Sequence, residues 1–189
     1  MSRHPARVLC VALVSALGLF GSTLLDAGVA RAAEPAAPTT AKVASSSSQA
    51  ATFSQEVLKL VNKARATKRK CGAKTYSKAK PLKWNVKLAQ AANNHSVDMA
   101  TRNYFSHTSQ NGRTAGARIK AAGYKYKAMG ETLAAGHRTP KAVVNAWLKS
   151  PGHCKILMSK SYTQLGVGYA IGDGKYVHYT SASFAKPKK

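Results

Sequence analysis

The spacing of apolar residues changes along this chain, and the change limits the fold more than any other feature. In residues 53–64 the apolar side chains recur every three or four positions, and this helical spacing returns in residues 88–99 and 142–147. Residues 165–184 instead form two short runs on either side of Gly172-Asp173-Gly174, as is typical of a β-hairpin. Helices first and strands last predict an α+β fold, with helices packed on an antiparallel sheet.

Cap and turn residues indicate where these elements begin and end. Thr52 and Gln55 have the spacing of a capping box, and Asn85 is a candidate N-cap for the second helix. Thr139 precedes Pro140 at the start of a third helix, which we expect to stop at the Ser-Pro-Gly of residues 150–152. We also expect a loop over residues 67–83, a loop over 104–113, a short helix over 114–122 and a strand over 129–135.

The N-terminal region has the pattern of an export signal. Arg3 and Arg7 precede an apolar run over residues 8–25, and Ala30-Arg31-Ala32 fits the small-x-small cleavage pattern. We therefore predict a signal peptide over residues 1–32 and a secreted, extracellular protein. The alternative is that the run remains as a membrane anchor, for which its length is marginal.

Composition divides the rest of the chain into three parts. Residues 33–52 are rich in Ala, Thr, Ser and Pro, and such a segment buries too little surface to offset its ordering entropy. We predict a disordered linker over residues 33–52, one domain over residues 53–185 and a basic tail over residues 186–189.

Two cysteines, Cys71 and Cys154, remain after the predicted cleavage, because Cys10 belongs to the signal segment. An even number of cysteines in an exported chain indicates one disulfide. The alternative is that Cys154 is a nucleophile activated by the adjacent His153.

The chain is strongly basic, with 30 Lys and Arg residues against 6 Asp and Glu. Cleavage after residue 32 would leave 27 basic and 5 acidic residues, a net charge of +22. A field of this size favours polyanionic partners, which we expect to be anionic cell-wall polymers or anionic lipid surfaces. Nucleic acid is a weaker expectation, because the sequence has no motif that interleaves aromatic and basic residues.

Three polar residues, His107, Glu131 and His153, stand where the apolar pattern does not require them. Two imidazoles and one carboxylate brought together can coordinate a divalent cation or transfer protons. Taken singly, each residue is better explained as an ordinary loop or rim residue. His95 lies on the predicted buried face of its helix, where we expect a hydrogen-bonded core histidine rather than a ligand.

Several segments in order resemble the bacterial branch of the CAP family, the cysteine-rich secretory, antigen 5 and pathogenesis-related-1 group. They are HSVDMATRNYFSH, AAGY, MGETLA, VVNAWLKSPGHCKIL and LGVGYA. The resemblance spans residues 53–184 and implies an α-β-α sandwich, in which helices flank a small antiparallel sheet with a cleft on one side.

The family's cleft carries two histidines and two acids, of which three match this chain at His107, Glu131 and His153. The second acid falls near Ser150, where this chain has no carboxylate. The resemblance implies zinc or another divalent cation at His107 and His153, and it implies a disulfide between Cys71 and Cys154.

Together these features favour a secreted, non-enzymatic binding module that is retained at anionic cell-surface polymers or membranes. Its cleft would hold a divalent metal or a small lipid. The alternative is a secreted, metal-assisted hydrolase, similar to a peptidase, with His107, Glu131 and His153 as its catalytic residues.

Overall fold

The computed structural model describes residues 40–189, with side chains described from residue 48 onward. The predicted signal peptide and residues 33–39 of the predicted linker lie outside the described residues. The elements are α1 (Thr40–Arg65), β1 (Arg69–Cys71), β2 (Lys74–Tyr76), β3 (Lys83–Trp84), α2 (Val86–Thr101), α3 (Ala115–Ala121), β4 (Tyr126–Ala135), α4 (Pro140–Lys149), α5 (Pro151–Met158), β5 (Gln164–Ile171) and β6 (His178–Pro187).

The centre of the fold is a four-stranded sheet in the order β3-β5-β6-β4. Strands β5 and β6 form the predicted hairpin, with Gln164 opposite Ala185 and Ile171 opposite His178. Strand β4 pairs antiparallel with β6 on its other side, so that β4 is an edge strand. The antiparallel prediction is correct for these three strands, whereas the two-residue β3 runs parallel to β5.

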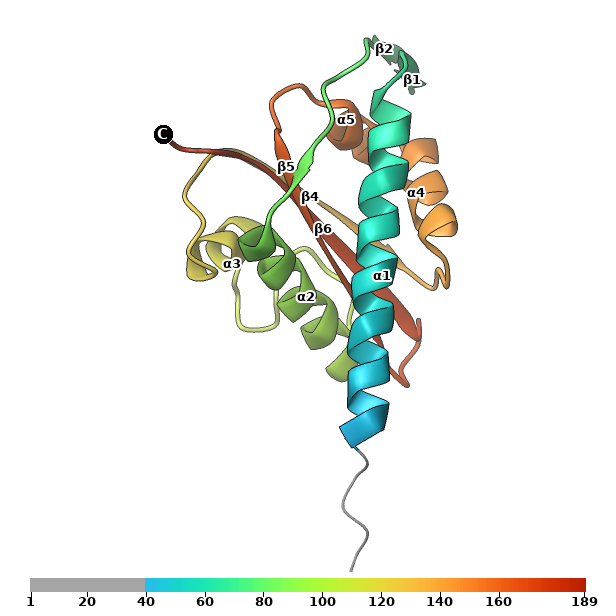
Figure 1. Cartoon of the computed structure of the whole chain (residues 1–189), viewed down its shortest axis with the longest axis vertical. Helices are drawn as coiled ribbons and strands as arrows, with labels where there is room; N and C mark the ends of the chain where they lie inside the picture. The colour runs from blue at the N-terminus through green and yellow to red at the C-terminus, as the bar shows by residue number, and fades with distance from the viewer. Residues whose placement is uncertain (1–39) are drawn as a thin grey trace, which may run out of the picture. The chain divides into compact units, whose positions relative to one another are not determined.

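Helices cover both faces of this sheet, which confirms the α-β-α sandwich (Figure 1). Side chains alternate along a strand, so Ala182 and Phe184 of β6 join one core and Ala185 joins another. The first core includes apolar residues of α1 and α4, and Trp147 at its centre is 1% exposed. The second core includes Leu88 of α2 and Ile119 of α3.

Two glycines of β5 let α2 lie directly on the sheet. A Cβ atom added to Gly166 would lie 2.0 Å from the Ala89 nitrogen, and one added to Gly168 would lie 2.2 Å from the Asn93 nitrogen. Any larger residue would therefore overlap the helix backbone. At this separation the Ser96 hydroxyl donates to the Gly168 carbonyl and accepts from the Ser181 amide, which joins α2 to both β5 and β6.

Two of the three helix caps predicted from the sequence, Asn85 and Thr139, are present, and Thr114 caps the short helix α3 in the same way. The side chains of Asn85, Thr114 and Thr139 accept hydrogen bonds from the first turns of α2, α3 and α4. The capping box at Thr52 is wrong, because α1 begins at Thr40 and the Thr52 hydroxyl donates to the Ser48 carbonyl one turn earlier. Helix α1 thus runs through part of the predicted linker, where Ala is frequent and neither Pro nor Gly interrupts.

The segment predicted as a loop over residues 67–83 contains three short strands. Strands β1 and β2 form a hairpin, and Cys71 of β1 is joined to Cys154 of α5 by the predicted disulfide. Cys154 is fully buried and its sulfur is bonded to Cys71, so the alternative of a nucleophilic Cys154 is wrong. No helix within residues 40–189 is both long and apolar enough to cross a membrane.

The tight contact between α2 and β5 predicts that Gly168→Ala lowers the free energy of unfolding by about 1–3 kcal/mol, because α2 must move away from the sheet. Gly152→Ala is the matched control, since no atom lies within 4 Å of the added Cβ in α5. Urea unfolding of both variants tests this prediction, and equal stability of the two would contradict it.

Candidate functional site

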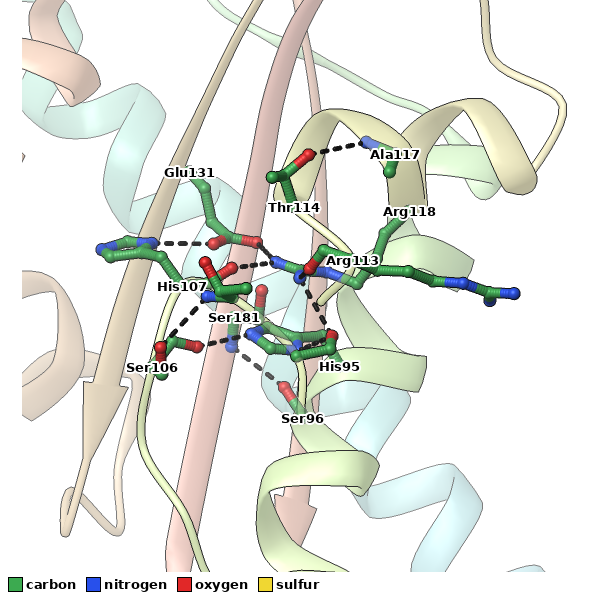
Figure 2. Close-up of polar contacts among 12 residues, drawn as sticks. His95, Ser96, Ser106, His107, Arg113, Thr114, Ala117, Arg118, Glu131 and Ser181 are labelled. Atoms are coloured by element: carbon green, nitrogen blue, oxygen red, sulfur yellow. Dashed lines mark hydrogen bonds and ion pairs between the residues drawn. The ribbon is translucent and has the colours of Figure 1, made fainter. Parts of the chain in front are cut away.

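His107 and Glu131 come from distant parts of the chain and meet at the edge of the sheet. Glu131 lies in β4, opposite Ser183 of β6, and it is buried. His107 lies in the segment between α2 and α3, and its Nδ1 atom is 2.8 Å from the Glu131 Oε1 atom (Figure 2). The structure therefore brings together two of the three residues selected from the sequence.

Arg118 of α3 completes this cluster, and sequence reasoning missed it. Its Nη2 atom donates to the Glu131 Oε2 atom at 2.6 Å and to the His107 carbonyl at 3.0 Å (Figure 2). Its Nη1 atom donates to the Arg113 carbonyl and to the Ser109 hydroxyl. The Arg118 and Glu131 side chains are only 8% and 4% exposed, so this is a buried ion pair.

The cluster determines the protonation state of Glu131. Burial alone would raise its pKa, but the hydrogen bond from His107 and the charge and hydrogen bonds of Arg118 lower the pKa below its ordinary value of 4.5. Both carboxylate oxygens already accept hydrogen bonds. Glu131 is therefore a weak base whose geometry suits it to orienting His107.

The ionised Glu131 also selects the tautomer of His107. A carboxylate can only accept, so the Nδ1 atom of His107 carries the hydrogen and donates to Oε1. In the neutral ring the Nε2 atom is then left with a free lone pair. The His107 side chain is 58% exposed, and Figure 2 shows its ring directed away from Arg118.

His153 lies in the first turn of α5, because Ser150-Pro151-Gly152 ends α4 and at the same time begins α5. Burial and then the charge of His107 lower the pKa of His153, which favours the neutral ring that a metal ion requires. Ser150, near which the resemblance places the family's second acid, is the N-cap residue of α5.

The contact between His107 and Glu131 is of a kind found at metal-binding histidines. A histidine that binds metal through one nitrogen commonly donates its other ring hydrogen to a carboxylate, and His107 makes this contact with Glu131. Within the described residues, no three or more His, Cys, Asp or Glu side chains are grouped as metal ligands. An ion held by His107 and His153 would therefore take its other ligands from water or substrate.

His95 is a core histidine, as predicted, and it supports the segment that carries His107. Its ring is 1% exposed, with Nε2 at 2.9 Å from the Ser106 carbonyl and Nδ1 at 3.4 Å from the Ser109 hydroxyl. Burial first, and then the charge of Arg118, lower its pKa. A polar cavity of about 350 Å³ opens beside His95 and Arg118.

The lowered pKa of Glu131 makes stability depend on pH. The unfolded chain binds a proton at Glu131 more tightly than the folded protein does. The free energy of unfolding should therefore fall as the pH drops below about 5, first past the ordinary pKa of Glu131 and then past its lower pKa in the folded state. Glu131→Gln should lose less stability over this window than the wild type. Asp173→Asn removes an exposed carboxylate and is the control. Urea unfolding at several pH values measures the slopes, and equal slopes for the wild type and Glu131→Gln would contradict the prediction.

Comparison with known proteins agrees with this architecture. The pattern described as "CAP: Cysteine-rich secretory protein family" matches residues 58–184. The uncharacterized protein YkwD of Bacillus subtilis is 34% identical over 144 residues, which cover 76% of this chain and 52% of YkwD. This chain thus spans about half the length of that relative.

Solved structures show the same fold. An extracellular protein containing a SCP domain from Bacillus anthracis has 31% sequence identity and a TM-score of 0.58, over 71% of this chain and 41% of that chain. An outer surface protein of Borrelia burgdorferi shares the fold at 21% identity and a TM-score of 0.55, over 70% of this chain and 94% of that chain. With the family pattern matching residues 58–184 and the fold shared with these solved structures, this chain belongs to the CAP, or cysteine-rich secretory protein, family.

Proposed function

We propose that this protein is an exported, non-enzymatic binding module that attaches to anionic polymers or lipids of a cell surface. The observation that carries the proposal is the large excess of basic residues over acidic ones. Residues 48–189 contain 26 Lys and Arg residues and four acids. Three of these acids, Glu56, Asp98 and Glu131, already form ion pairs with Lys59, Arg102 and Arg118.

Most of the remaining basic side chains are therefore available to external anions. Most of them are exposed and occur in every helix and in the β1–β2 hairpin, so attachment would involve a broad surface. Attraction of this kind is long-ranged at low ionic strength and is screened over about 8–10 Å at physiological salt.

The geometry around Glu131 supports binding rather than catalysis. Both of its oxygens are occupied, and this chain has no carboxylate near Ser150, where the second acid of the family's cleft falls. We infer that His107 and His153 form a divalent-cation site, with Glu131 orienting His107. A small lipid is a further candidate ligand of the family's cleft.

The free Nε2 atom of His107 favours a second candidate function, a metal-assisted hydrolase. A histidine oriented by a carboxylate through its other nitrogen is a suitable general base. A bound divalent cation would lower the pKa of a coordinated water and so supply the nucleophile. Under this alternative, His107→Ala would abolish hydrolysis of a protein substrate by the zinc-loaded protein.

Attachment to polymers is tested with wall sacculi that carry phosphodiester polymers. We expect the mature protein to bind these sacculi and to be released as salt is raised, since each neutralised phosphate releases a counterion. Binding should be lost after the polymers are removed by acid, and it should persist in the His107→Ala/His153→Ala variant. Retention on the stripped sacculi, or release that does not depend on salt, would overturn the proposal.

The metal site is tested by isothermal titration calorimetry with zinc. We expect one saturable site in the wild type, no such site in His107→Ala/His153→Ala, and affinity lowered by about 10–100-fold in Glu131→Gln, which removes the charge that orients His107. His137→Ala removes a half-buried histidine outside the cluster and should bind as the wild type does. Equal affinity in all four proteins would place zinc elsewhere.

A further inference from the structure

A second cavity, of about 590 Å³, lies where the end of α1 meets two surface segments. Its walls are Arg65, residues 78–81, Lys160 and residues 162–163, and none of His107, Glu131 or His153 lines it. Figure 1 shows the C-terminal end of α1, the segment from β2 to β3 and the loop after α5 at the same end of the domain. The cavity is thus separate from the candidate metal site.

Arg65 lines this cavity although it is only 1% exposed. Its Nε atom donates to the Lys80 carbonyl at 2.9 Å, and its Nη1 atom donates to the carbonyls of Leu157 and Ser159 at 2.6 and 2.9 Å. These bonds use three of the five N–H groups of a guanidinium. The Nη2 atom makes no hydrogen bond with any residue from 48 to 189.

The charge of Arg65 is also unpaired within the described part of the chain. No carboxylate forms an ion pair with it, whereas the other buried arginine, Arg118, is paired with Glu131. Carbonyl dipoles satisfy hydrogen bonds but carry no net charge, and a buried cation without a counter-charge is costly. An anion in the cavity would supply both the missing charge and an acceptor for Nη2.

The other residues that line the cavity indicate what kind of anion fits. Lys78, Lys80 and Lys160 add three exposed ammonium groups, and no acid lines the cavity. Ala79, Pro81 and Tyr162 contribute apolar surface. Four cations beside an apolar wall suit a doubly charged oxyanion joined to a small organic group, because a planar guanidinium can donate neighbouring N–H groups to phosphate oxygens.

We propose that this cavity binds the phosphate group of a small phosphomonoester. The phosphate would contact Arg65 and the three lysines, and the organic group would lie against Pro81 and Tyr162. This inference goes beyond the proposed function, because attachment by a broad basic surface needs no cavity and no buried arginine.

The test is calorimetric titration of the mature protein with glycerol 3-phosphate at about 150 mM salt, where surface attraction is screened. We expect one saturable site, weaker binding of inorganic phosphate and no binding of glycerol. Lys80→Ala/Lys160→Ala should lower the affinity at least about tenfold by removing two charge-assisted contacts. The carbonyl that Lys80 offers to Arg65 belongs to the main chain and is kept in this variant.

Lys141→Ala/Lys149→Ala is the matched control, because it removes the same charge from exposed positions of α4 outside the cavity. It should bind glycerol 3-phosphate within about twofold of the wild type, which is the scatter expected of distant, independent sites. Absence of a saturable site, or an equal loss in both double variants, would overturn the proposal. A protein that still binds polymer-bearing sacculi but not glycerol 3-phosphate would overturn the cavity alone and leave the proposed attachment standing.

Discussion

The close approach of α2 to β5 is the constraint on which the rest of the structure depends. Gly166 and Gly168 leave no side chain between the helix and the strand, so the two backbones pack against each other directly. This contact lets Ser96 form hydrogen bonds with two strands. It also fixes the position of the end of α2, from which the segment that carries His107 begins. The two glycines therefore determine how close the layer of α2 and α3 lies to the sheet. This layer and the segment within it carry Arg118 and His107 of the candidate site.

The candidate site separates a buried, fully bonded part from an exposed part. Arg118 and Glu131 form a buried ion pair. His95 contacts the Ser106 carbonyl and Arg118 donates to the His107 carbonyl, so both fix the main chain around His107. Only the His107 ring reaches well into solvent, with its tautomer selected by the charge below it. This arrangement gives one imidazole nitrogen a defined direction, which serves a metal ligand and a general base equally well.

Two buried arginines in one small domain have opposite surroundings. Arg118 is neutralised by Glu131, whereas Arg65 has only main-chain carbonyls around it and lines a cavity bordered by lysines. In a domain with 26 basic residues and four acids, internal counter-charges are scarce. The unpaired arginine is therefore the stronger indication of a specific anion, while the exposed lysines indicate a general affinity for polyanions.

The sequence by itself determined the features that depend on local pattern. The N-caps at Asn85 and Thr139, the final hairpin and the disulfide between the two remaining cysteines follow from neighbouring residues or from counting, and all are confirmed. The start of α1 was missed because no local stop signal separates residues 40–51 from the helix that follows. The tertiary structure alone decided that β3 runs parallel to β5, that Arg118 pairs with Glu131, and that Arg65 is buried without a carboxylate. These features join residues far apart in a chain rich in lysine and arginine, and only packing determines which cation is buried and which anion it meets.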